Sequence, residues 1–117
     1  MKKLLIVEDV PMNRELLTQL LEDLYELEFA FDGEQALSMI FETAYDGVLL
    51  DISLPKLDGF GVAREVRLDG LKLPIIAVTA HAMNGVHHRI IEAGCNDCVT
   101  KPIDEEILYA SIRKYIG

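Results

Sequence analysis

The sequence contains no tryptophan, only two cysteines and only four prolines among its 117 residues. Two cysteines are too few for the disulfide framework of a small secreted domain. No apolar run reaches the roughly 20 residues that a transmembrane helix needs. The apolar run after Lys2 and Lys3 is too short for a signal peptide and ends in two acids. These absences favour a cytoplasmic globular protein.

Positive charge is also scarce, because 11 lysines and arginines stand against 20 acids and leave a net charge of -9. A chain with this charge repels nucleic-acid phosphates and anionic membrane surfaces. We therefore expect neither nucleic acid nor a membrane as a direct partner. Where carboxylates cluster, the same charge would favour a divalent cation.

Short apolar runs alternate with amphipathic stretches along the whole chain, whose length is that of one domain. Several runs are apolar at consecutive positions, which is typical of strands that are covered on both faces. These runs predict strands at 4–7, 25–30, 48–50, 75–78 and, more weakly, 98–99.

Apolar residues at helical spacing predict a helix after each of these strands. Asp32 with Gln35 resembles a capping box at the start of the second helix, and Asp104 can cap the fifth. Gly94 is a good terminator for a fourth helix over 86–93. Residues expected on apolar helix faces are Leu16, Leu17, Leu20, Leu21 and Leu24; Ala36, Leu37 and Ile40; Val62, Ala63 and Val66; and Ile107, Leu108, Ile112 and Ile116.

Five strand–helix units imply a parallel sheet with right-handed crossovers. We expect an α/β fold with a doubly wound, flavodoxin-like five-stranded sheet of order 2-1-3-4-5, helices on both faces, and one domain over residues 1–117. In such sheets, ligands bind at the carboxyl ends of the strands beside the switch in strand order.

Polar residues follow four of the predicted strands at this edge. Glu8 and Asp9 end the first strand, Asp51 the third and Thr79 the fourth, while Lys101 follows the fifth. At about 5 Å and an effective dielectric near 20, each pair of carboxylates repels by roughly 3 kcal/mol. One lysine cannot neutralise three acids, so a hard divalent ion such as Mg²⁺ fits this set.

The same residues suit phosphoryl transfer, which needs positioning and charge neutralisation. Asp51 can act as the nucleophile that accepts the phosphoryl group. A metal ion and Lys101 would neutralise the phosphoryl oxygens, and Thr79 would donate a hydrogen bond to one of them.

Four segments carry a resemblance to a known family: Leu-Ile-Val-Glu-Asp at 5–9, Leu-Leu-Asp-Ile-Ser-Leu-Pro-Lys-Leu-Asp-Gly at 49–59, Ala-Val-Thr-Ala at 77–80 and Thr-Lys-Pro-Ile at 100–103. In this order and spacing, they make the chain resemble response-regulator receiver domains over essentially its full length. The asparagine four residues after Asp9, Asn13, is a feature in which the chain resembles the receivers of hybrid sensor kinases and phosphorelays.

The resemblance implies that Glu8 and Asp9 are the acidic pair, that Asp51 is phosphorylated, and that Mg²⁺ (or Mn²⁺) is held by these acids and the backbone carbonyl of Ser53. It also implies a cis bond before Pro102 and an influence of His81 on phosphoryl loss. The list of expected catalytic residues is Asp51, Thr79 and Lys101.

The resemblance further implies a phosphoacceptor in a two-component or phosphorelay system rather than an enzyme, with only its own phosphorylation and slow autodephosphorylation as catalysis. The donor would be a phosphohistidine on a sensor histidine kinase or a histidine phosphotransfer protein. The face formed by the fourth helix, the fifth strand and the fifth helix would then signal to a downstream effector protein or output domain.

Cys98 departs from the family pattern, because receivers usually carry tyrosine or phenylalanine three residues before the lysine. A thiol cannot sweep the volume of a ring, so a degenerate receiver that binds partners without phosphorylation stays open as an alternative. Cys95 and Cys98 also form a C-x-x-C motif, but a redox or zinc role is less expected than two small residues in a loop and strand.

Two other functions on a similar sheet are less compatible with the residues. A flavodoxin needs a phosphate-binding loop after the first strand, where this chain has Glu8-Asp9-Val10-Pro11. A hydrolase with an aspartate nucleophile commonly has a second acid two residues later, where this chain has Ser53.

Overall fold

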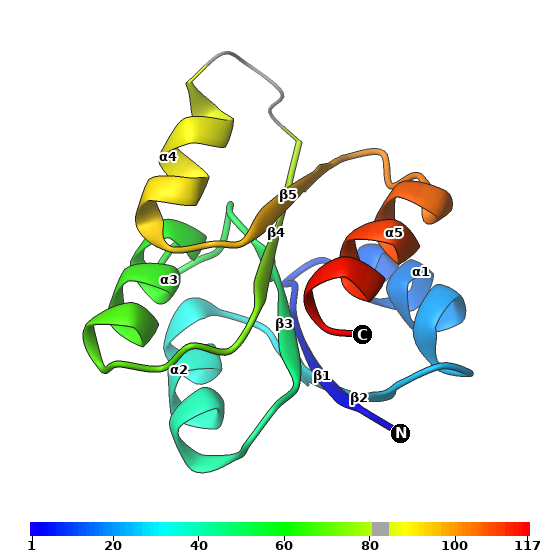
Figure 1. Cartoon of the computed structure of the whole chain (residues 1–117), viewed down its shortest axis with the longest axis horizontal. Coiled ribbons are helices and arrows are strands. Elements are labelled where there is room, and N and C mark those ends of the chain that lie inside the picture. The colour runs from blue at the N-terminus through cyan, green and yellow to red at the C-terminus, as the bar shows by residue number, and fades with distance from the viewer. Residues whose placement is uncertain (81–84) are drawn as a thin grey trace.

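The computed structural model describes residues 1–80 and 85–117. Five parallel strands form one sheet of order β2-β1-β3-β4-β5, with the helices on its two faces (Figure 1). The predicted α/β fold and strand order are confirmed. The elements in chain order are β1 Lys3–Val7, α1 Pro11–Leu21, β2 Glu26–Ala30, α2 Gly33–Glu42, β3 Gly47–Asp51, α3 Gly59–Leu68, β4 Ile75–Thr79, α4 Val86–Ala93, β5 Asp97–Thr100 and α5 Glu105–Tyr115.

The sheet is covered on both faces because side chains along each strand alternate between two cores. From β1, Leu5 and Val7 enter the core beneath α2, α3 and α4. Leu4 and Ile6 enter the other core, beneath α1 and α5. All residues of β3 and β4 are buried, so the consecutive apolar positions in the sequence correctly predicted central strands.

Local sequence signals set the helix ends. The Asp32 carboxylate accepts a hydrogen bond from Gln35 N at 2.7 Å and caps α2. Gln35 Oε1, however, accepts from Phe31 N, one residue earlier than a capping box requires. Asp104 caps α5, and Gly94 ends α4 in a left-handed conformation, both as predicted.

Three leucine or isoleucine positions differ from the predicted apolar faces. Leu16 and Leu24 are 40% and 54% exposed, and Ile107 is 58% exposed. Adjacent helical residues point about 100° apart, so only Leu17 and Leu21 on α1 are fully packed. Leu24 lies beyond the end of α1, which stops at Leu21.

No helix in the described part of the chain combines the length and the hydropathy that crossing a bilayer requires.

Neighbouring residues of α5 provide a test of this packing. Leu108 is completely buried, whereas Ile107 is exposed. We expect Leu108→Ala to lower the free energy of unfolding by about 2–5 kcal/mol, because it leaves a cavity under α5. The matched variant Ile107→Ala should change it by no more than about 0.5 kcal/mol. Urea unfolding measures both, and equal losses would contradict the observed orientation of α5.

Candidate functional site

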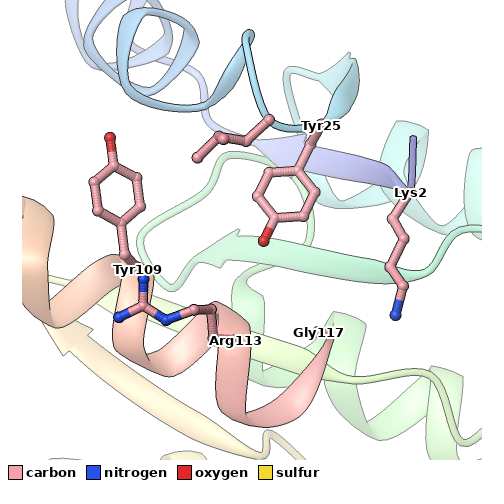
Figure 2. Close-up of a pocket in the computed structure, with 6 residues that line it drawn as sticks. Lys2, Tyr25, Tyr109, Arg113 and Gly117 are labelled. Carbon is pink, nitrogen blue, oxygen red and sulfur yellow. The ribbon is translucent and has the colours of Figure 1, made fainter.

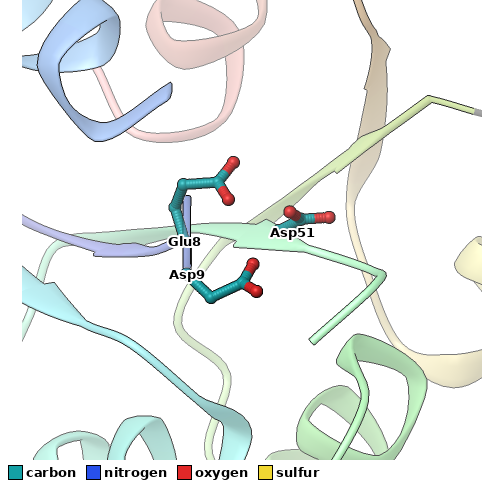
Figure 3. A group of neighbouring side chains, drawn as sticks. All are labelled: Glu8, Asp9 and Asp51. Carbon is teal, nitrogen blue, oxygen red and sulfur yellow. The ribbon is translucent and has the colours of Figure 1, made fainter. Parts of the chain in front are cut away.

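Three acids meet at the carboxyl ends of the central strands (Figure 3). One carboxylate oxygen from each of Glu8, Asp9 and Asp51 lies within 4.8 Å of the other two. Glu8 and Asp9 follow β1, and Asp51 is the last residue of β3, the strand that pairs with β1. Parallel pairing therefore brings together acids that are more than 40 residues apart in sequence, as predicted.

Lys101 places a cation at this cluster. Its Nζ lies 3.1 Å from Glu8 Oε1 and 3.1 Å from Asp51 Oδ2. Lys101 N donates to Thr79 O at 2.7 Å, and its bond to Pro102 is cis, as expected. The backbone after β5 thus directs the ammonium group over the ends of β1 and β3.

Thr79 and Ser53 complete the predicted set. Thr79 is the last residue of β4, is buried, and pairs in register with Thr100 of β5. Ser53 N donates to Asp51 Oδ1 at 3.0 Å. The structure therefore brings all the predicted site residues to one edge of the sheet, although the role of the Ser53 carbonyl stays a prediction. His81 lies outside the described residues.

The electrostatics of the cluster are unbalanced. Glu8 is only 2% exposed, and this burial raises its pKa above 4.5. A hydrogen bond from Val10 N opposes the increase, whereas the negative charge of Asp51 raises the pKa of Glu8 further. Burial disfavours the charged form of Lys101, but its hydrogen bonds with Glu8 and Asp51 outweigh this and raise its pKa. One ammonium group thus faces three carboxylates.

This donor set fits a hard divalent cation. Three oxygens within 4.8 Å of one another can share one ion, and oxygen ligands are those that Mg²⁺ takes. An ion placed there would neutralise the charge that Lys101 leaves uncompensated.

Glycine allows the loop after β3 to fold closely onto the site. A Cβ on Gly59, the first residue of α3, would lie 2.7 Å from the backbone oxygen of Asp51. Asp58 caps α3 by accepting from Gly61 N at 2.9 Å, so Asp58-Gly59 forms the turn and the start of the helix. The glycine therefore permits the approach of α3 to Asp51.

One contact at the site was not predicted. Arg14 Nη1 donates to the backbone oxygen of Glu8 at 3.1 Å, and its guanidinium stacks 4.4 Å from the centroid of Phe31. This pair ties α1 to the loop that carries the acids. A basic residue in the first turns of the helix after an acidic pair was the available signal, but it does not reveal which carbonyl the guanidinium binds.

The two cysteines are separate from this chemistry. Cys95 and Cys98 are free thiols, and burial raises the pKa of Cys95 to about 12 and also raises that of Cys98. Reactive thiols have lowered pKa values. Within the described residues, no cysteine belongs to a cluster that could hold a metal. The two small residues therefore lie in a loop and a strand, as favoured from the sequence.

A hollow lies near the amino-terminal end of β1, away from the acid cluster (Figure 2). It has a volume of about 360 Å³, and Lys2, Tyr25, Tyr109 and Arg113 are among the residues that line it. None of the predicted site residues contributes to its lining. The acid cluster, and not this hollow, is the place where the predicted chemistry comes together.

The family of the chain follows from a match to the model of the response regulator receiver domain, which covers residues 4–113. The chain belongs to this family. Receiver domains are parts of two-component and phosphorelay proteins, including hybrid kinases, so the resemblance seen in the sequence is confirmed.

Similar proteins include sensor kinases. The chain is 36% identical over 113 residues to the sensor histidine kinase RcsC of Salmonella typhimurium. The aligned region covers 96% of this chain and 12% of RcsC. It is 40% identical to hybrid signal transduction histidine kinase I of Dictyostelium discoideum, over 98% of this chain and 7% of that protein. The chain thus spans only a small part of the length of these curated relatives.

A solved structure shows the same architecture. The receiver domain of the sensor histidine kinase PA1611 from Pseudomonas aeruginosa PAO1 has a TM-score of 0.91 and 36% identity, over 99% of this chain and 98% of that one. That crystal structure is described as having a magnesium ion coordinated in its active-site cleft.

The raised pKa of Glu8 predicts a specific pH dependence in metal-free receiver. The folded state holds the Glu8 proton more tightly than the unfolded state. Protonated Glu8 therefore stabilises the fold fully below about pH 4.5, and this stabilisation is lost as the pH rises through the pKa of the folded state. Glu8→Gln cannot titrate. In EDTA, urea midpoints should therefore fall with rising pH more steeply for the wild type than for Glu8→Gln, whereas parallel curves would contradict the direction of the shift.

Proposed function

We propose that the chain, over residues 1–117, is a phosphoacceptor receiver whose Asp51 takes a phosphoryl group from a phosphohistidine. The observation that carries the proposal is the meeting of Glu8, Asp9 and Lys101 around the carboxylate of Asp51 at the end of β3. This is the arrangement that an aspartyl nucleophile needs when the incoming group is itself negatively charged.

In the proposed reaction, a carboxylate oxygen of Asp51 attacks phosphorus, and the phosphorus–nitrogen bond of the phosphohistidine breaks. The imidazole leaves with the electron pair of that bond, and Asp51 becomes an acyl phosphate. Lys101, now 3.1 Å from Asp51 Oδ2, would pair with a phosphoryl oxygen. Thr79 would donate a hydrogen bond from its hydroxyl to another phosphoryl oxygen as negative charge increases at the end of β3.

Glu8, Asp9, Asp51 and the backbone carbonyl of Ser53 would hold Mg²⁺ (or Mn²⁺). When bound, the ion supplies positive charge that lowers the repulsion between the acids and the incoming phosphoryl group. The carboxylate cluster, which has one lysine for three acids, supports this assignment.

We assign the chain a signalling rather than a metabolic role, with a sensor histidine kinase or a histidine phosphotransfer protein as the donor. The kinase relatives support this choice. Phosphorylation would bias a pre-existing equilibrium in the face of α4, β5 and α5, which a downstream effector or output domain would bind. A cytoplasmic location and a lack of direct nucleic-acid binding stay predictions from the sequence.

Phosphoryl transfer to Asp51 can be tested with a small donor. With Mg²⁺ and acetyl phosphate, we expect intact-protein mass spectrometry to detect one added phosphoryl group on the wild type. Asp51→Asn should abolish it, because the amide is not a nucleophile, and EDTA should do the same. Asp69→Asn, at the exposed end of α3, is the matched control and should be phosphorylated like the wild type.

Unchanged phosphorylation of Asp51→Asn would place the acceptor elsewhere. No addition to the wild type from acetyl phosphate or from a phosphorylated histidine kinase would favour the degenerate receiver instead.

A further inference from the structure

A cavity of about 300 Å³ lies next to the acid cluster, between the start of α3 and α4. Ser53, Thr79, Phe60 and Arg89 are among the residues that line it. Ser53 N donates a hydrogen bond to the carboxylate of Asp51, and Thr79 is the last residue of β4, the strand that pairs with β3. The cavity therefore lies between a cation on α4 and two residues that flank the proposed phosphoacceptor.

The side chain of Arg89 makes a weak contact with an aromatic ring. Its guanidinium stacks 4.5 Å from the ring centroid of Phe60, at the start of α3, and its side chain is exposed. Among the described residues, no carboxylate lies within ion-pair distance of it. A guanidinium has five N–H donors, which the face of a ring cannot satisfy as hydrogen bonds.

Phosphorylation of Asp51 would create a second possible partner for the Arg89 guanidinium besides the ring of Phe60. The acyl phosphate carries about two negative charges where the Asp51 carboxylate carried one, in a cluster in which Lys101 already pairs with two acids. Arginine binds phosphoryl oxygens through paired, charge-assisted hydrogen bonds, which are stronger than an exposed contact with a ring. An anion at Asp51 would therefore compete with Phe60 for the guanidinium.

We propose that Arg89 detects the phosphoryl group: its guanidinium leaves the ring of Phe60 and crosses the cavity to pair with a phosphoryl oxygen on Asp51. This inference rests on the proposed function. Because Arg89 lies on α4, the new pair would draw that helix toward the end of β3.

Cys98 is the reason that this chain needs another route from the phosphoryl group to α4. It lies half-buried on β5 and packs against the core beneath α3 and α4, where receivers usually place an aromatic ring. A thiol cannot report the state of Thr79 by moving a large volume. Arg89 would couple phosphorylation to α4 directly, without a ring on β5.

The experiment uses beryllofluoride, a stable mimic of the phosphoryl group, with Mg²⁺. In the wild type, we expect the Arg89 side-chain NMR signals to lose the ring-current shift that Phe60 causes when the mimic binds. Arg89→Ala should weaken apparent beryllofluoride affinity by roughly tenfold, since one hydrogen-bonded charge is lost. Arg89→Lys should recover part of this loss, because the positive charge remains. Arg64→Ala, which removes an exposed arginine from α3, is the matched control and should bind like the wild type.

Three results would overturn the inference. Arg89→Ala with the same affinity as Arg64→Ala shows that the guanidinium does not contact the mimic. Arg89 signals that stay ring-shifted show that it does not leave Phe60. Departure from the ring without loss of affinity in Arg89→Ala shows that it moves to another partner, such as Asp58. If the mimic does not bind the wild type at all, the proposed function fails and the inference fails with it.

Discussion

Repulsion between carboxylates is the constraint on which the site depends. Three negative oxygens lie within 4.8 Å of one another beside one ammonium group. At this separation each pair of acids repels by about 3 kcal/mol at an effective dielectric near 20. The parallel sheet supplies the rigidity that holds them together, because β1 and β3 are neighbours and both are buried. The arrangement is therefore suited to a charged ligand that relieves the repulsion.

Much of the fold could be predicted because its signals are local. Consecutive apolar residues marked β3 and β4, and Asp32, Asp104 and Gly94 marked helix ends. The site could be predicted because parallel strands bring their carboxyl ends to one edge. The exposure of Ile107 could not be predicted, because the sequence does not show whether an apolar residue next to a buried helix stripe packs into the core or faces solvent.

The contacts that sequence could not predict are those of the arginines. Arg14 binds the backbone of Glu8, and Arg89 covers Phe60, yet both look like ordinary surface cations in sequence. Their roles depend on which ring and which carbonyl the tertiary fold places nearby. Both guanidiniums stack on aromatic rings; Arg14 also contacts the backbone of Glu8, whereas Arg89 lines the cavity that Ser53 and Thr79 share.

We propose that Glu8, Asp9 and Asp51 share a single metal ion, and locating that ion tests this proposal most directly. Crystals soaked in Mn²⁺ would give an anomalous diffraction peak at each bound ion. We predict a strong peak in contact with these three carboxylates and the backbone carbonyl of Ser53. Strong occupancy at other acids, with none at this cluster, would contradict it.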